Sequence, residues 1–190
     1  IATMGLNHAV ITVVNRDDLP DSGAGHYRKC LEAVRERCPE VTLELLCSDL
    51  AGDHQDLSDL LIGLELEVFA HNVECVPRLD SKVRDHRATF DQSIGILKEA
   101  KRLRPDILTK SSIMVGLGET DDEITEALQL LKDAGVDLVT IGQYLAPSPK
   151  HLLVDRFPEP DRYDEWSKQI EEMGFLGWAC GPLVRSSYKA

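Results

Sequence analysis

The stretch ILTKSSIMVGLGETDDEITEALQLLKDAGVDLVTI, residues 107–141, decides the fold. It begins with an apolar, β-branched run over 107–115 and ends with another over 136–141, and both have the length of a buried strand. Between these runs, Thr120 and Glu123 have the spacing of a helix capping box. The apolar residues that follow recur with the period of a helix: Ile124, Ala127, Leu128 and Leu131. The stretch therefore predicts strand, helix and strand, the unit that builds parallel sheets.

The same alternation of strand-like and helix-like segments continues on both sides of this stretch. Further strands are expected at 8–14, 41–46, 67–70 and 175–180. Helices are expected around 27–34, at 57–61, at 90–103 and at 161–173. The Gly-x-Gly-x-x-Gly pattern of a dinucleotide-binding sheet does not follow the first strand. We therefore predict an α/β fold, a partial (β/α) barrel with parallel strands, in which residues 1–190 form a single domain.

Charge and composition exclude several classes of partner. The 190 residues hold 21 Lys and Arg against 33 Asp and Glu, a net charge of −12, whereas nucleic-acid and anionic-membrane binders need a basic face. No apolar run reaches the roughly 18 residues of a membrane-spanning helix. We expect no nucleic-acid or membrane partner. The chain starts at Ile1 with no visible targeting segment, so we expect a fragment of a cytoplasmic protein, or of a mitochondrial or plastid one that has lost its transit peptide.

The five cysteines give no local metal or redox motif. They are scattered along the chain and no two have the Cys-x-x-Cys spacing: Cys30, Cys38, Cys47, Cys75 and Cys180. We expect them to be reduced thiols, several of them buried as small apolar residues.

Polar residues collect where four of the predicted strands end. These segments are 15–18, 71–74, 116–120 and 142–144. In barrel enzymes the loops at the carboxyl ends of the strands converge on one mouth, and the chemistry takes place there. The residues alone therefore predict an α/β enzyme with a polar mouth.

Each of these polar groups also has a plainer interpretation. Asp17 and Asp18 can cap a turn, and Glu119 can serve as first-turn charge of the helix that follows it. Gly116 gives only a weak phosphate-loop signal, because the Walker lysine is missing. Lys110 can form a Schiff base as in aldolases, but a single lysine on a strand is more often an ion-pair partner.

Read together, the segments resemble the lipoyl synthases over essentially the whole chain. The matching blocks are NRDDLPD (15–21), HNVE (71–74), LTKS (108–111), MVGLGET (114–120) and TIGQYL (140–145). The most specific block is the carboxyl-terminal GPLVRSSYKA (181–190), which carries that family's Arg-Ser-Ser-Tyr-x-Ala signature.

The resemblance implies a radical S-adenosylmethionine sulfurtransferase that uses two [4Fe–4S] clusters. One cluster cleaves S-adenosylmethionine to a radical that removes hydrogen from C6 and C8 of a protein-bound octanoyl chain, and the auxiliary cluster supplies two sulfurs. The expected partner is an octanoylated lipoyl-carrier domain or H protein. The family's two clustered cysteine runs, C-x4-C-x5-C and C-x3-C-x2-C, are missing from this chain. It is best interpreted as the carboxyl-side part of a lipoyl synthase, inactive by itself.

The resemblance also assigns site residues. Asn72 and Glu74 are expected to bind the ribose hydroxyls or the amino-acid end of S-adenosylmethionine. The same mouth is expected to be lined by Asn15, Arg16, Asp17, Gln143 and Tyr144. Ser187, on a tail expected to be extended over the mouth, is the expected iron ligand of the auxiliary cluster, because a hard oxygen donor holds iron less firmly than a thiolate. Ser186 would then face the other way.

Three other interpretations remain open at this stage. The first is another radical enzyme resembling biotin synthase, against which the Arg-Ser-Ser-Tyr tail speaks. The second is a half-enzyme that pairs with a separate cluster-bearing chain. The third is an aldolase-like barrel in which Lys110 forms the Schiff base.

Overall fold

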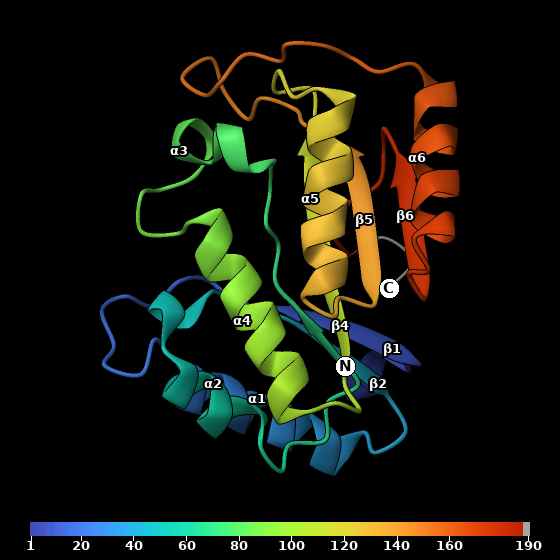
Figure 1. Cartoon of the computed structure of the whole chain (residues 1–190). Coiled ribbons are helices and arrows are strands. Elements are labelled where there is room, and N and C mark those ends of the chain that lie inside the picture. The colour runs from blue at the N-terminus through green and yellow to red at the C-terminus, as the bar shows by residue number, and fades with distance from the viewer. Residues whose placement is uncertain (188–190) are drawn as a thin grey trace.

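Six parallel strands form one sheet in the order in which they occur along the chain (Figure 1). The computed structural model describes residues 1–187. The strands are β1 (His8–Thr12), β2 (Thr42–Leu46), β3 (Val68–Ala70), β4 (Leu108–Val115), β5 (Leu138–Gln143) and β6 (Gly177–Gly181). Each strand pairs in parallel with the next. The predicted α/β partial barrel is confirmed, and within the described residues the sheet does not close into a full barrel.

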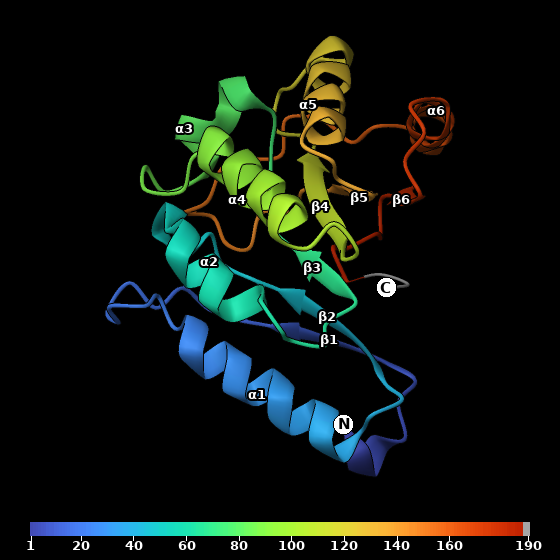
Figure 2. The same cartoon turned by 60° about the horizontal axis from the view of Figure 1, so that its bottom comes forward.

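Helices connect the strands and lie along one side of the curved sheet, with the carboxyl-terminal tail on the other side (Figure 2). They are α1 (Ala24–Arg37), α2 (His54–Leu61), α3 (Asp80–Val83), α4 (Phe90–Leu103), α5 (Asp121–Asp133) and α6 (Pro160–Glu172). Three short 3-10 turns complete the described elements: η1 (Ala2–Met4), η2 (Leu50–Gly52) and η3 (Pro77–Leu79). The predicted capping box at the start of α5 is present, with Thr120 and Glu123 each bonding the other's backbone nitrogen.

The ends of several elements differ from the sequence prediction for identifiable reasons. Helix α2 begins at His54 rather than at residue 57, because the Asp53 side chain accepts hydrogen bonds from the first free backbone nitrogens. Strand β5 begins at Leu138 rather than at residue 136, because the Val136 nitrogen still bonds the end of α5. The Asp137 carboxylate accepts a bond from the Thr109 nitrogen of β4.

The apolar core lies between the helices and the sheet in two adjoining clusters. One cluster packs β1, β2 and β3 against α1, α2 and α4, with Leu43, Leu45 and Phe69 fully buried. The other packs β4 and β5 against α5 and α6 around Ile113, Ile141 and Trp166. Because side chains alternate along a strand, the residues between these positions face the inner side of the sheet.

A buried ion pair lies on this inner face. The Lys110 ammonium of β4 is 3.0 and 3.1 Å from the two carboxylate oxygens of Glu44 on β2, and the side chains are only 6% and 2% exposed. The His8 ring of β1 lies 3.8 Å from the same carboxylate. Lys110 is therefore an ion-pair partner, as the plainer interpretation held, and its amine is enclosed and occupied.

Replacing Lys110 with methionine should lower the free energy of unfolding by about 3–5 kcal/mol, because the Glu44 carboxylate then remains as an uncompensated buried charge. Urea denaturation measures this loss. The double variant Glu44→Leu with Lys110→Met removes both charges and should lose less stability than Lys110→Met alone. A single variant as stable as the parent chain would show that the ion pair is not buried as described.

Candidate functional site

Three adjoining pockets follow the carboxyl edge of the sheet. The central compartment is lined by the ends of β1, β2 and β3 and by the segment after α3: Val13, Asn15, Leu46, Cys47, Ser48, Asp49, His71, Asn72, Glu74, Arg84, Asp85 and Ala88. It shares Asn15, Asp49, Asp85 and Ala88 with an outer compartment beside the β1–α1 loop. Asn72 and Glu74 also line a third pocket, the tail compartment. The three form one polar groove, and the central compartment, at ≈ 340 Å³, is large enough for a small ligand.

Asn72 and Glu74 stand together between the central and tail compartments. The Asn72 side-chain nitrogen donates to a Glu74 carboxylate oxygen at 3.1 Å. Glu74 has a left-handed backbone with φ of 68°, which is uncommon for a residue other than glycine. Its backbone nitrogen bonds Ser112 and its carbonyl accepts from Met114, so β4 fixes this conformation. Such strain is found mostly at functional sites, where the surrounding structure maintains it.

The electrostatics of Glu74 suit a ligand-binding carboxyl. Burial raises the pKa of the Glu74 carboxyl, while the Asn72 hydrogen bond and the charge of Arg84 oppose that rise. A carboxyl held this way gains from a ligand that offers hydrogen-bond donors, such as a pair of hydroxyls.

Ser48 offers a second polar position in the central compartment. Its hydroxyl is buried near the Tyr27 hydroxyl and the Cys47 thiol, yet it makes no hydrogen bond of acceptable geometry within residues 1–187. Ser48 therefore lines the compartment with its hydroxyl turned among neighbouring side chains.

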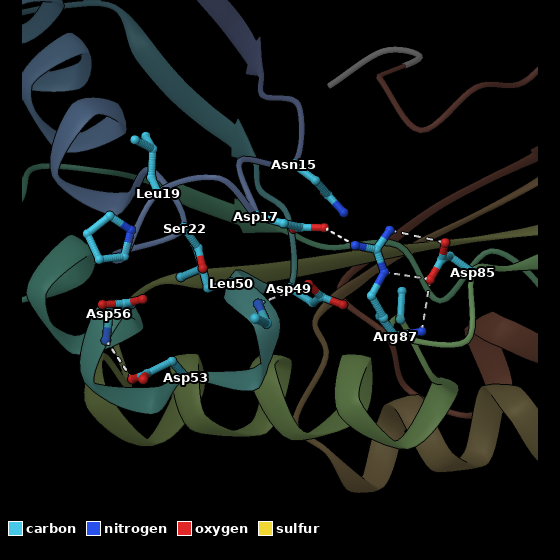
Figure 3. A pocket seen from close by; sticks show the side chains of 13 residues that line it. Asn15, Asp17, Leu19, Ser22, Asp49, Leu50, Asp53, Asp56, Asp85 and Arg87 are labelled. Atoms are coloured by element: carbon cyan, nitrogen blue, oxygen red, sulfur yellow. Dashed lines mark hydrogen bonds and ion pairs between the residues drawn. The ribbon is translucent and has the colours of Figure 1, made fainter.

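The outer compartment is acidic (Figure 3). Asp17 accepts a bond of 2.7 Å from Arg87, which also bonds Asp85 on its own loop. Asp49 is held by the Ala51 nitrogen and by the Gln92 side chain. These contacts join the β1–α1 loop to the segment after α3 and form one wall of the groove.

Only part of the predicted mouth lines the groove. Asn15, Asp17, Asn72, Glu74 and Gln143 do so, as Figure 3 shows for the first two. Arg16 instead pairs with Asp18 through two bonds of 2.7 Å and is absent from the lining of all three compartments.

Gln143 and Tyr144 hold loops in place. The Gln143 amide nitrogen donates to three backbone carbonyls, including those of Val115 and Arg156, and its oxygen accepts from the Tyr163 hydroxyl. Gln143 borders the tail compartment with its remaining surface. The Tyr144 hydroxyl donates to the Leu152 carbonyl, which anchors the β5–α6 loop.

Glu119 fixes the loop that precedes α5. Its buried carboxylate accepts bonds of 2.8 Å from the backbone nitrogens of Gly116 and Leu117, and Arg156 approaches it at 3.4 Å. Glu119 therefore does more than supply first-turn charge. The nitrogens that a phosphate loop would offer are already bonded to Glu119.

The carboxyl-terminal tail crosses the end of β5. A side chain at Gly142 would bring its Cβ to 2.3 Å from the Val184 carbonyl oxygen, so the tail lies directly on this glycine. Ser186 lines the tail compartment with Asn72 and Glu74, whereas Ser187 is exposed and outside that lining. The two serines lie in a turn, so the expectation of an extended tail is wrong at this point. Tyr188 and Ala190 of the signature lie outside the described residues.

The thiols do not suit an iron–sulfur cluster. The part of the chain that the structure describes contains no group of three or more His, Cys, Asp or Glu side chains placed to hold a metal ion. Cys47 and Cys75 are buried, and burial raises the pKa of each thiol to about 12. A cluster needs converging thiolates, so its ligands are not supplied by these residues.

Some groove residues were not predicted from the sequence. Ser48 and Asp49 are the second and third residues after β2, and their place at the end of a predicted strand is the signal that identifies them. Arg84 comes from the segment after the short helix α3, for which the sequence gives no periodic signal.

None of the helices in residues 1–187 is long and apolar enough to cross a membrane.

The amino-acid sequence is similar to a protein family model and to individual known proteins. Residues 1–131 match the family model of the radical SAM superfamily. The whole chain is 47% identical to the mitochondrial lipoyl synthase of Homo sapiens, 48% to the chloroplastic one of Arabidopsis thaliana and 50% to that of Thermus thermophilus. It covers 51%, 48% and 58% of these relatives, and so spans about half of their length.

Solved structures share the fold at low sequence identity. Methylornithine synthase superposes with a TM-score of 0.70 at 13% identity, over 96% of this chain and 60% of that one. Streptococcus suis SuiB bound to S-adenosylmethionine gives 0.58 at 10% identity, over 93% and 50%. At these identities the likeness concerns the fold alone.

Replacing Gly142 with alanine should displace the tail, because the new methyl group cannot occupy the place of the Val184 carbonyl. We expect trypsin to cut after Arg185 several-fold faster than in the parent chain, as followed by intact mass. Gly95→Ala in α4, where a Cβ meets nothing within 4 Å, is the matched control and should leave the rate unchanged. Equal rates in the Gly142→Ala variant and the parent would contradict the seating of the tail.

Proposed function

The chain belongs to the radical SAM superfamily, and from this premise we propose that it is the carboxyl-side part of a lipoyl synthase. Identities of 47–50% over all of its residues support the narrower assignment. The whole protein would then insert two sulfurs at C6 and C8 of a protein-bound octanoyl chain. Residues 1–190 alone would be inactive, as one part of a single domain whose sheet is continuous from β1 to β6.

One observation carries this proposal beyond the superfamily. The tail that bears the Arg-Ser-Ser-Tyr signature is seated on Gly142, and Ser186 lines the same compartment as Asn72 and Glu74. The sequence block that most distinguishes lipoyl synthases therefore meets the mouth where the superfamily's chemistry is expected. This arrangement gives no support to the biotin-synthase-like alternative or to a Schiff base on Lys110.

The groove residues fit S-adenosylmethionine. When bound, this cofactor supplies the carbon radical that begins the reaction. Glu74 and Asn72 are placed to bond its ribose hydroxyls or its amino-acid end. Asn15 and Asp17 would line the same site from the β1–α1 loop. Arg16, Gln143 and Tyr144 contribute by holding the surrounding loops.

The [4Fe–4S] clusters, two in the intact enzyme, do not fit the thiols of this chain, so their cysteine ligands would come from outside residues 1–190. A separate chain or a preceding segment can supply them. The tail offers one further ligand, a serine hydroxyl, for which Ser187 is the residue expected from the resemblance and Ser186 the one inside the compartment.

The substrate partner would be an octanoylated lipoyl-carrier domain or H protein, with no nucleic acid or membrane involved. The relatives are bacterial, mitochondrial and chloroplastic. We propose a cytoplasmic location, since the five free cysteines suit a reducing compartment, and an organellar one agrees equally well with the named relatives.

Glu74→Ala in the intact, cluster-bearing protein should weaken S-adenosylmethionine binding by roughly 10- to 100-fold, the usual effect of losing hydrogen bonds to a charged group. Equilibrium dialysis with labelled cofactor measures the dissociation constant. Glu126→Ala, at an exposed position of α5, is the control and should bind as tightly as the parent protein. Unchanged affinity in Glu74→Ala would refute the placement of the cofactor.

The tail serines can be told apart by iron content. In the intact protein, the variant that removes the true ligand should lose the auxiliary cluster and sulfur insertion, while the other serine variant keeps both. The proposal names Ser187, so Ser187→Ala is expected to show the loss. Loss in Ser186→Ala alone would move the ligand by one residue, and survival of both activities in each variant would exclude a serine ligand.

A further inference from the structure

His71 is a buried histidine that the proposed binding of cofactor does not use. It directly follows β3, is 6% exposed, and its backbone nitrogen bonds the Lys110 carbonyl. Its Nδ1 lies 2.9 Å from the Cys47 carbonyl oxygen at the end of β2. Its Nε2 lies 2.8 Å from the Ser93 hydroxyl in the first turns of α4. Both ring nitrogens of the residue that begins this segment are therefore engaged.

These partners determine where the protons lie. The Cys47 carbonyl can only accept, so Nδ1 carries hydrogen. The Arg84 guanidinium can only donate, and its Nη1 is 2.9 Å from the Ser93 oxygen. The Ser93 hydrogen is then free to point at Nε2, which accepts in the neutral ring. Burial lowers the pKa of His71, in agreement with a neutral imidazole.

The chain of bonds continues to the groove. Arg84, 9% exposed, is held by Ser93 and lies 3.7 Å from Asp80, whose other oxygen accepts from the first nitrogen of α4. Arg84 lines the central compartment with Glu74. The charge of Arg84 acts to lower the pKa of the Glu74 carboxyl, against the larger effect of burial.

We propose that His71 is a positioning residue for the Asn72–Glu74 pair. Its neutral ring ties the segment after β3 to β2 and α4, and through the Ser93 hydroxyl it holds the Arg84 guanidinium in the compartment that Glu74 also lines. This inference rests on the proposed function in one respect only: the ligand that benefits from the positioned pair is taken to be S-adenosylmethionine.

Few charged groups compete for this role. The groups that act on the His71 ring are Asp49, beside η2, and Arg84, after α3, with the Cys47 backbone and the Ser93 hydroxyl in direct contact. The groups that act on the Glu74 carboxyl are Asn72 and Arg84, while Asp49, Asp85 and Arg185 line the same compartments. Changes at Ser93 therefore reach Glu74 through Arg84 rather than through another charge.

The first test uses the 190-residue chain and needs no cofactor. The side-chain carboxyl of Glu74 is followed by ¹³C NMR during a pH titration in Ser93→Ala, Ser93→Thr and His71→Gln. Ser93→Ala and His71→Gln should raise the midpoint of the Glu74 titration. The charge of a released Arg84 is more strongly screened by solvent, and so it opposes protonation of the Glu74 carboxylate less. Ser93→Thr keeps the hydroxyl and should restore the parent midpoint. His54→Gln, the same substitution at an exposed histidine of α2, should leave it unchanged.

The second test measures S-adenosylmethionine binding to the intact, cluster-bearing protein. Ser93→Ala should weaken binding by about tenfold, the effect of one lost hydrogen bond, and Ser93→Thr should recover it. An unchanged Glu74 midpoint in Ser93→Ala, with only the melting temperature lowered, would overturn the proposal and leave His71 a structural residue. Absence of cofactor binding in the parent protein would instead refute the proposed function, while the titration still decides whether His71 positions Glu74.

Discussion

Parallel pairing is the constraint on which the rest of this structure depends. Six strands that run in one direction and neighbour one another in chain order must all end at the same edge of the sheet. Residues as distant in sequence as Asn15, Asn72 and Ser186 therefore meet along one groove. The helices cover the outer face of the sheet with the two adjoining apolar clusters, which leaves the carboxyl edge and the inner face for polar groups.

Polar side chains at that edge divide into two kinds. His71, Glu119 and Gln143 are buried and bonded to backbone or hydroxyl groups of neighbouring strands and loops. They offset the cost of ending buried strands, whose backbone groups would otherwise lack partners. Asn72 and Glu74 bond each other and keep surface in the groove. Residues of the first kind hold strands and loops in position, and residues of the second kind are free to bind a ligand. This distinction depends on contacts between strands, which no local sequence pattern contains.

The alternation of strands and helices could be predicted from the sequence because its apolar periods are strong, above all in residues 107–141. Helix α3 and the 3-10 turns could not, since they are too short to show a period. The convergence of strand ends predicts that Asn15, Asp17, Asn72, Glu74 and Gln143 line one groove, as they do, while their role in binding the cofactor stays a prediction. The sequence places Arg16 and Tyr144 with them, because it does not reveal that Asp18 and the Leu152 carbonyl engage their polar groups. The packing of the tail on Gly142 likewise depends on a contact across 42 positions.

We infer that this chain supplies the cofactor groove while the cysteine ligands of the clusters lie outside residues 1–190. Anaerobic reconstitution with iron and sulfide tests it most directly, on the 190-residue chain and on the same chain preceded by the cysteine-bearing segment of a relative. We expect no stoichiometric iron on the chain alone, and four-iron clusters with cleavage of S-adenosylmethionine once the segment is added. A four-iron cluster bound to residues 1–190 by themselves would contradict it.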